Sequence, residues 1–390
     1  MVDKYLFFAV SLLITIGVIS SYSLSTFSVL SLNYEWYHFF IRQLFAGILA
    51  ICIIWILAIQ NPDKMIKKVG FMLLTFGLLG MIIMPFLPES FATSAGGAKR
   101  WIRLGPLSIA PVEFFKIGFI FFLAFSFSRK FSLNKKITML EEVKLILPYA
   151  FVFFIVILLI AVMQNDLGQI VLIALTLTIM LFSAGSSIKL FGSLIISAIF
   201  AALIIIITSE HRILRVKSWW GSIQNFVLSL FPEAVAVHLR IQDAPEPYQI
   251  SHSLNAIYNG GIIGTGVGNG IFKLGFLSEV HTDFVLAGIA EETGIIGLLF
   301  VTVTMFFIIF RIFQIANRSQ NQVYFLFCLG VALLISFSFL INSFGISGLT
   351  PVKGIAVPFL SYGGSSLWAL AFGIGMVLSI SKTMIKNGKN

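Results

Sequence analysis

Five ionisable side chains lie close together in the segment SEVHTDFVLAGIAEETG, residues 278–294. They are Glu279, His281, Asp283, Glu291 and Glu292, in a 390-residue chain that has only 16 acidic residues and is 11% charged. A carboxylate in a partly apolar site can have its pKa raised toward the range useful for a general base. Asp283, beside His281, is therefore the first candidate for a catalytic residue.

The rest of the chain places these residues at a membrane. It is 58% hydrophobic with 41 Phe residues, whereas globular proteins carry about 25% charged residues. Runs of roughly 20 apolar residues are long enough to cross a bilayer. We expect an all-α polytopic membrane protein, a single transmembrane domain over 1–390 whose ten spans lie at 5–25, 40–60, 66–88, 112–128, 145–163, 168–186, 188–208, 283–313, 322–344 and 362–382.

The basic residues predict the orientation, because Lys and Arg are retained on the cytoplasmic side. With both termini inside, only four acidic residues (Asp3, Asp63, Glu141, Glu142) fall on that side. The net charge of +10 then follows from topology, and no nucleic acid partner is implied. The cytoplasmic basic residues are Lys4, Lys64, Lys67, Lys68, Arg129, Lys130, Lys135, Lys136, Lys144, Lys189, Arg311, Arg318, Lys382, Lys386 and Lys389.

Asp283 would then lie at the outer end of the eighth span, with Glu291 and Glu292 two to three helical turns deeper. Ionisable groups at that depth are costly and are functional or paired. For Glu291 and Glu292, pairing with buried basic or polar groups is the alternative to a functional role.

Two other outer segments carry charge before a span. Lys99, Arg100 and Arg103 in GGAKRWIRLGP are either solvated or form a site for phosphate, which suits the guanidinium group. Glu113 and Lys116, three residues apart on the next helix, can face each other as an ion pair.

Turn-forming sequences mark three more outer segments. QNDLG places Asp166 in a tight turn, which Asx-turn chemistry explains without a function. GGIIGTGVGNG (260–270) lacks the preceding strand of a nucleotide site, and close backbone packing is the better interpretation. In 350–366, Pro and Gly exclude a regular helix, and the N–H groups from Ser361 to Ser366, which open the last helix, suit an anion.

The long segment 209–282 is expected on the outer side. Within it, NFVLSLFPEAVAVHLR is apolar enough for a helix lying in the membrane interface. Cys52 and Cys328 both lie within spans as small hydrophobic residues, and no disulfide or metal framework is visible.

Taken together, GAKRWIRLG, QNDLG, RVKSWW, YQISHSLNAIYNGGIIGTGVGN, KLGFLSEVHTDFVLAGIAEETGIIG and PVKGIAVPFLSYGGSSL resemble the signature segments of the SEDS family in order and spacing. That family comprises the ten-span peptidoglycan polymerases of the FtsW and RodA types. RVKSWW and the pair Lys353–Gly354 resemble the division (FtsW) type more than the elongation (RodA) type. The chain departs from the family pattern at Ala110, at Val112 and at Asn165, and 221–247 is long.

The resemblance implies glycosyl transfer at the outer face of a bacterial cytoplasmic (inner) membrane, at the division septum, joining the disaccharide units of lipid II into glycan strands. Asp283 takes the role of the base on the family pattern, and basic residues would stabilise the pyrophosphate leaving group. The candidate substrate-binding residues are Lys99, Arg100, Arg103, Glu113, Lys116, Asp166, Arg215, Glu279, His281, Lys353, Ser361 and Ser365.

The implied partners are a class B penicillin-binding protein that supplies the transpeptidase and other divisome proteins. No metal ligand set is assigned, and participation of a divalent cation is left open. Three alternatives remain at this point: a lipid II flippase, an elongation polymerase of the RodA type and a noncatalytic septal scaffold. A flippase would need polar or discontinuous spans on both sides of the membrane midplane.

Overall fold

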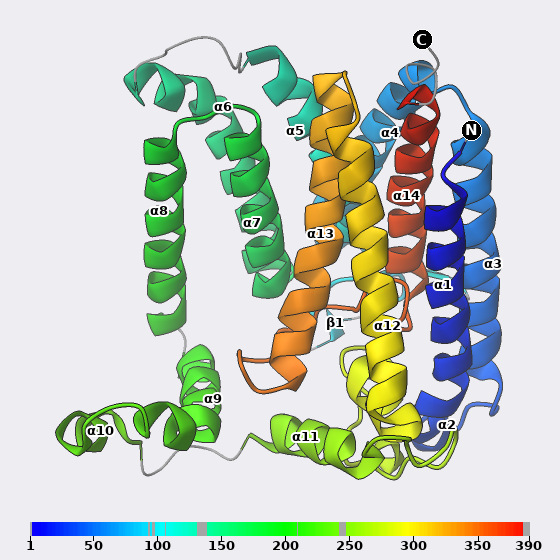
Figure 1. Ribbon diagram of the computed structural model, residues 1–390, viewed down its shortest axis with the longest axis vertical. Coiled ribbons are helices and arrows are strands. Elements are labelled where there is room, and N and C mark those ends of the chain that lie inside the picture. Colours follow the sequence, from blue (N-terminus) through cyan, green and yellow to red (C-terminus); the bar gives the residue numbers. More distant parts are fainter. Residues whose placement is uncertain are drawn as a thin grey trace.

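The computed structural model describes residues 2–92, 94–95, 98–105, 107–130, 139–208, 210–241 and 247–384, which form a helical bundle (Figure 1). Short strands pair as two antiparallel hairpins between the fourth and fifth helices. The helices are α1 (Lys4–Leu24), α2 (Thr26–Ser31), α3 (His38–Ile59), α4 (Pro62–Ile83), α5 (Pro111–Lys130), α6 (Met139–Ile157), α7 (Leu167–Ser183), α8 (Ile188–Ile207), α9 (Glu210–Leu228), α10 (Glu233–Leu239), α11 (Tyr248–Gly260), α12 (Val285–Asn317), α13 (Gln322–Ile346) and α14 (Gly364–Met384).

Shorter elements connect these helices. Turns of 3-10 helix occupy Met84–Phe86 and Phe272–Leu274, and a π-helical turn, Leu158–Met163, continues α6. The strands are β1 (Ser94–Ala95), β2 (Ala98–Lys99), β3 (Ile102–Leu104) and β4 (Leu107–Ile109).

The helices confirm a multi-pass membrane protein. Within the described part of the chain, eight are long and apolar enough to cross a bilayer: α1, α3, α4, α5, α6, α12, α13 and α14. The apolar helices α7 and α8 add two shorter stretches. Their order matches the predicted spans, while the number of ten crossings stays a prediction.

The two ends of the bundle differ. The start of α1 and the end of α14 meet at one end, where the Asp3 N–H donates to Ser381 Oγ over 3.1 Å (Figure 1). We call this the terminal end. Helices α9, α10 and α11 lie at the opposite end, here called the loop end. Lys135, Lys136, Asp243, Lys386 and Lys389 are outside the described residues.

The core is formed by α5, α13 and α14, whose side chains are mostly buried. Helix α5 approaches α4 closely because Gly118 has no side chain: a Cβ atom there would lie 2.2 Å from the Leu74 backbone nitrogen. Small residues allow such close approach between membrane helices, where packing drives association.

Helix α12 is broken near its start. Gly294 has φ 69° and ψ −171°, so a short helix from Val285 ends there and a longer one begins. A helix long and apolar enough to cross the membrane lies where the eighth span, 283–313, is predicted, and Gly294 divides it into two helical segments. The short helix that starts at Val285 and the chain before it contribute to the site described below.

The long segment 209–282 has its own helices and contacts. Trp219 on α9 donates its indole N–H to the Gly348 carbonyl over 2.9 Å, which docks this segment on the end of α13. The predicted interfacial helix is two helices: α9 ends at Leu228, and Pro232 precedes α10. Exposed Phe226 and Val237 keep its apolar character.

Candidate active site

Asp283 lies just before α12 and is held by its backbone. Its carbonyl accepts a hydrogen bond of 2.6 Å from Asn342 Nδ2 on α13, and its N–H donates to the Glu279 carbonyl over 3.1 Å. The carboxylate is half-buried and faces the 347–363 loop, since a Cβ atom at Gly354 would lie 3.0 Å from Asp283 Oδ2.

The surroundings raise the pKa of Asp283 to about 6. Burial is the main cause, the carboxylates of Glu279 and Asp166 add to it, and the Arg100 guanidinium opposes it. A carboxylate with such a pKa is ionised near neutral pH and remains basic enough to accept a proton in a reaction.

Arg100 brings the loop between β2 and β3 to this site. Its Nε donates to the Gln164 carbonyl over 2.8 Å and its Nη2 to the Asn165 carbonyl over 3.0 Å. Asp166 follows directly and caps α7 by accepting from the Gln169 N–H. Burial raises the pKa of Asp166, against the pull of Arg100. The predicted turn is confirmed, and it lies beside the predicted base.

Lys353 belongs to the same cluster of charges. Burial and the cations Arg215 and Arg212 on α9 lower its pKa, while Asp166 acts in the opposite direction. The Lys353 carbonyl packs against α7, because a Cβ atom at Gly168 would lie 3.1 Å from it. The connection between α6 and α7, the loop that carries Arg100 and the 347–363 loop thus come together beside Asp283, and α9 acts on Lys353.

The two predicted serines do not present free hydroxyls. Ser361 Oγ donates to the Thr282 carbonyl over 2.6 Å and accepts from the Val357 N–H over 2.7 Å. Ser365 Oγ donates to the Ser108 carbonyl over 2.8 Å and accepts from the Ala110 N–H over 3.0 Å. Both hydroxyls hold loops in place, and the prediction that Ser361 and Ser365 bind substrate stays untested.

The three basic side chains predicted to contact phosphate, Lys99, Arg100 and Arg103, make different contacts. Lys99 Nζ donates to the Leu87 carbonyl over 2.6 Å and to the Pro85 carbonyl over 3.3 Å, so this ammonium supports the chain after α4. Arg103 lies on β3 with an exposed side chain. Of the three cations, Arg100 acts on Asp283.

Glu113 and Lys116 form the ion pair that their spacing indicates. Lys116 Nζ is 2.9 Å from Glu113 Oε2 and donates to Gln169 Oε1 over 2.8 Å. The three residues line a cavity of about 30 Å³ together with the 355–358 segment. Their charges are satisfied by one another, which favours the structural alternative over substrate contact.

Glu279 and His281 flank Asp283 differently. Glu279 is exposed, and its carboxylate accepts from the Thr282 hydroxyl over 2.8 Å. His281 is buried between the rings of Phe39 and Tyr362, and burial lowers its pKa. A neutral, packed imidazole favours a role for His281 in holding the segment before α12 in place.

Glu291 and Glu292 are paired, as the structural alternative predicts. Lys273 Nζ lies 2.6 Å from Glu292 Oε1, with the side chains 3% and 5% exposed. Glu291 Oε1 accepts from Asn259 Nδ2 over 3.0 Å and from the Ile271 N–H over 2.7 Å. They bind residues around α11 and Ser23 at the end of α1, and their depth relative to Asp283 stays a prediction.

The glycine-rich segment 260–270 packs against the same short helix. A Cβ atom at Gly260 would lie 1.9 Å from the Ala290 carbonyl oxygen, and the Thr265 N–H donates to the Glu291 carbonyl over 3.0 Å. Close backbone packing is confirmed for this segment. Together with Lys273 it fixes the short helix that follows Asp283.

Two amides at the site were not recognised from the sequence. Asn342 bridges the Asp283 and Ile355 carbonyls, and Gln43 on α3 bonds the Ser361 carbonyl and the Gly363 N–H. Each is an amide within an otherwise apolar span. A buried amide in a membrane helix needs hydrogen-bonding partners, so its position in the sequence could have indicated a structural or functional role.

Comparison with known proteins identifies the family. The family model described as cell cycle protein, FtsW/RodA/SpoVE, matches residues 3–386. The chain belongs to this family. The match spans every segment that contributes to the Asp283 site, from Gln43 to Ser365.

Relatives and structures of the FtsW/RodA/SpoVE family agree. A probable peptidoglycan glycosyltransferase FtsW of Helicobacter pylori (strain J99) is 53% identical over 381 residues, which covers 97% of this chain and 98% of the relative. One of Bacillus subtilis is 33% identical over 388 residues, covering 97% and 90%. The rod shape determining protein RodA of Thermus thermophilus has the same fold, with TM-score 0.66, 22% identity and 98% and 97% covered.

A further structure of the same fold comes from work on a peptidoglycan synthase complex that coordinates polymerisation and crosslinking. It has a TM-score of 0.69 and 21% identity, and the match covers 99% of each chain. At this sequence identity the similarity shows the fold alone. The site residues of this chain are therefore assigned from their own contacts and charges.

Proposed function

We propose that this protein is a peptidoglycan glycosyltransferase that joins lipid II units into glycan strands at the outer face of the cytoplasmic membrane during cell division. One observation carries the proposal: Asp283 is a half-buried carboxylate with a pKa of about 6, and the Arg100 guanidinium acts on it beside the carboxylates of Glu279 and Asp166. The relatives named FtsW, peptidoglycan glycosyltransferases, support the reaction type.

In the proposed reaction Asp283 accepts the proton of the acceptor sugar hydroxyl. The oxygen forms a bond to the anomeric carbon of the donor as the bond from that carbon to the pyrophosphate oxygen breaks. General bases of this kind contribute about 10²- to 10⁴-fold. Asn342 positions the base by donating to the backbone carbonyl of Asp283. This bond leaves both carboxylate oxygens of Asp283 available for the proton.

The leaving undecaprenyl pyrophosphate takes on charge that cations can stabilise. Arg100, Lys353 and Arg215 are the candidates, because Arg100 acts on Asp283, and Arg215 acts on Lys353, through electrostatics. Guanidinium groups bind phosphate in bidentate fashion, and ammonium groups act as point charges. Arg100 and Lys353 are therefore proposed as donor contacts in place of Lys99.

The sequence leaves the participation of a divalent cation open. Among the described residues, no cluster of three or more His, Cys, Asp or Glu side chains could hold a metal ion. A cation would then take oxygen ligands from the donor pyrophosphate, as magnesium commonly does. Chelation of a purified, active protein tests this requirement.

The proposed partners are a class B penicillin-binding protein transpeptidase and other divisome proteins, in the membrane at the septum. The solved peptidoglycan synthase complex with the same fold supports such an assembly. Within the family, the identity to relatives named FtsW favours the division role over the elongation role.

The proposed orientation places the terminal end in the cytoplasm, because basic residues gather there. Cysteines introduced one at a time at exposed Gln320, between α12 and α13, and at exposed Ser229, between α9 and α10, test it in intact cells. An impermeant reagent is expected to label position 229 and not 320. The reverse pattern would put the Asp283 site on the wrong side for lipid II polymerisation.

The function itself is tested with the purified protein, its cognate transpeptidase and lipid II. Glycan strands that form in the presence of a transpeptidase inhibitor support the proposal. Transbilayer movement of lipid II in vesicles without strand formation favours a flippase instead. Neither activity, in a protein that still binds its partner, favours a noncatalytic scaffold.

A further inference from the structure

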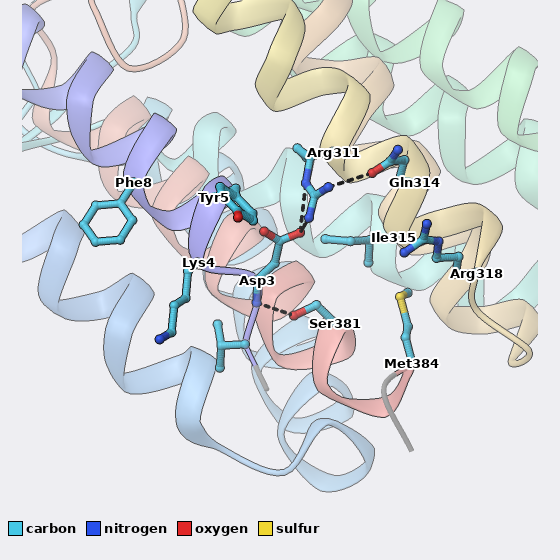
Figure 2. A pocket seen from close by; sticks show the side chains of 11 residues that line it. Asp3, Lys4, Tyr5, Phe8, Arg311, Gln314, Ile315, Arg318, Ser381 and Met384 are labelled. Atoms are coloured by element: carbon cyan, nitrogen blue, oxygen red, sulfur yellow. Dashed lines mark hydrogen bonds and ion pairs between the residues drawn. The ribbon is translucent and has the colours of Figure 1, made fainter. Parts of the chain in front are cut away.

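A cavity of about 490 Å³ opens at the terminal end of the bundle, away from Asp283. It lies among the start of α1, the last turns of α12 and the end of α14 (Figure 2). Its lining is mixed: it has charged groups from α12 and from the N-terminal segment, and aromatic side chains from α1. The proposed glycosyl transfer takes place at the loop end and does not involve this cavity.

The centre of the cavity is fixed by an ion pair. Arg311 donates from Nη2 to Asp3 Oδ2 over 2.6 Å and from Nε over 3.1 Å, and its Nη1 donates to Gln314 Oε1 over 2.9 Å. The other oxygen of Asp3 accepts from the Leu6 N–H and caps α1. Asp3 is thus fully engaged in holding Arg311 and the start of α1.

Two further cations stand on either side of this pair. Figure 2 shows Lys4 and Arg318 at opposite margins of the cavity, with the Asp3–Arg311 pair between them. Across the described residues, no hydrogen bond or ion pair engages the Lys4 or Arg318 side chain, and both residues are exposed. The lining therefore carries three cations against one carboxylate, an excess of two positive charges.

The aromatic side chains of the cavity belong to a helix that can cross the membrane. Tyr5 and Phe8 on α1 are 70% and 66% exposed, and α1 is long and apolar enough to cross the bilayer. Side chains so placed at the start of a span lie at the boundary between lipid headgroups and acyl chains. The cavity thus offers cations at headgroup level and an apolar surface below them.

We propose that this cavity binds an anionic phospholipid of the inner leaflet, with its headgroup over the Asp3–Arg311 pair and attracted by Lys4 and Arg318, and with its acyl chains along Tyr5 and Phe8. Basic pockets between membrane helices on the cytoplasmic side recognise anionic headgroups in this way. The exposed cations Lys64 and Lys189 start helices that run from the same end and do not line the cavity. The inference goes beyond glycosyl transfer and shares with it the proposed orientation alone.

Native mass spectrometry of the full-length protein, released from detergent micelles with added lipid, tests the site. Phosphatidylglycerol is compared with phosphatidylcholine of the same acyl chains, and the double variant Lys4→Gln/Arg318→Gln is compared with Lys64→Gln/Lys189→Gln, which changes the charge equally. We expect preferential retention of phosphatidylglycerol by the wild type and the control. Removing both cations is expected to weaken it about 25-fold, about fivefold for each.

Soluble glycerol 3-phosphate separates a lipid site from a simple phosphate site. It is expected not to displace phosphatidylglycerol at equal concentration, because it lacks the acyl chains that cover Tyr5 and Phe8. Displacement, equal retention by the two double variants, or equal retention of the two lipids by the wild type would overturn the proposal. If the Lys4→Gln/Arg318→Gln protein fails to fold, the single variant Arg318→Gln is measured and is expected to show the fivefold loss.

Discussion

Gly354 lies against the carboxylate of Asp283, so closely that a Cβ atom at position 354 would be 3.0 Å from Asp283 Oδ2. Gly354 also has φ 61°, a conformation that L side chains rarely adopt. The contact joins two loops that are far apart in the sequence, and it sets the space on one side of the proposed base.

Gly354→Ala is therefore expected to lower the rate of lipid II polymerisation by about 10- to 100-fold, since small displacements of a catalytic group have effects of this size. Gly192→Ala is the matched control, because nothing lies within 4 Å of a Cβ atom there. Equal rates for the two variants, measured with purified lipid II, would show that position 354 does not constrain the base.

The pH dependence of the reaction follows from the pKa of Asp283. A base must be deprotonated, so activity should rise with pH and reach half its maximum near the pKa of about 6. Glu279 raises this pKa and Arg100 lowers it. Glu279→Gln should move the acidic limb of the kcat/KM profile to lower pH, and Arg100→Gln to higher pH. Shifts in the same direction for both variants would contradict this electrostatic account.

Lys353 and Arg215 are expected to act on the donor. Lys353→Gln or Arg215→Gln should reduce kcat/KM for lipid II by about 10- to 100-fold, because hydrogen bonds to charged groups contribute about 1.5–3 kcal/mol. Lys217→Gln, on the same helix and also exposed, is the control for the change in charge. A loss as large in the Lys217 variant would indicate a general effect of positive charge.

The buried pair Lys273–Glu292 should matter for stability. Removing one partner leaves the other charge buried, so Glu292→Gln is expected to lower the free energy of unfolding by about 3–5 kcal/mol. The double variant Lys273→Met/Glu292→Gln should recover much of the loss. Thermal unfolding of Lys273→Met, Glu292→Gln and the double variant beside the wild type measures the coupling, and additive losses would argue against a paired role.

The sequence was sufficient to predict much of this architecture. Long apolar runs predict the membrane helices in order, since a bilayer admits few other structures. The spacing of Glu113 and Lys116 predicts their ion pair, which is confirmed. The crowding of Glu279, His281 and Asp283 predicts a site, and that assignment stays a prediction. These features depend on composition and on contacts within one helix, which are local in the sequence.

What escaped prediction depends on contacts between distant segments. Hydropathy treats the eighth span as continuous, whereas the break at Gly294 depends on packing against the segment after α11. Similarly, Ser361 and Ser365 are polar residues near a helix start, but their hydroxyls bond to Thr282 and Ser108. Asn342 binds the carbonyl of Asp283, which lies 59 residues earlier in the sequence, so its role depends on a contact between distant segments.

Asp283→Asn tests the central claim most directly. The amide is nearly isosteric, and Asn342 holds the backbone carbonyl of residue 283, so the fold should be kept. The pKa of Asp283 is higher in the folded protein than in the unfolded chain, so ionisation costs stability as pH rises through about 6. A neutral Asn at pH 7 avoids that cost, and thermal stability should be unchanged or higher.

The decisive measurement is lipid II polymerisation by purified Asp283→Asn together with its unfolding temperature, with Glu279→Gln as the neighbouring control. The account predicts a rate lower by at least about 10²- to 10⁴-fold, in a protein that unfolds no earlier than the wild type. Polymerisation by the Asn variant at the wild-type rate would contradict the assignment of Asp283 as the base.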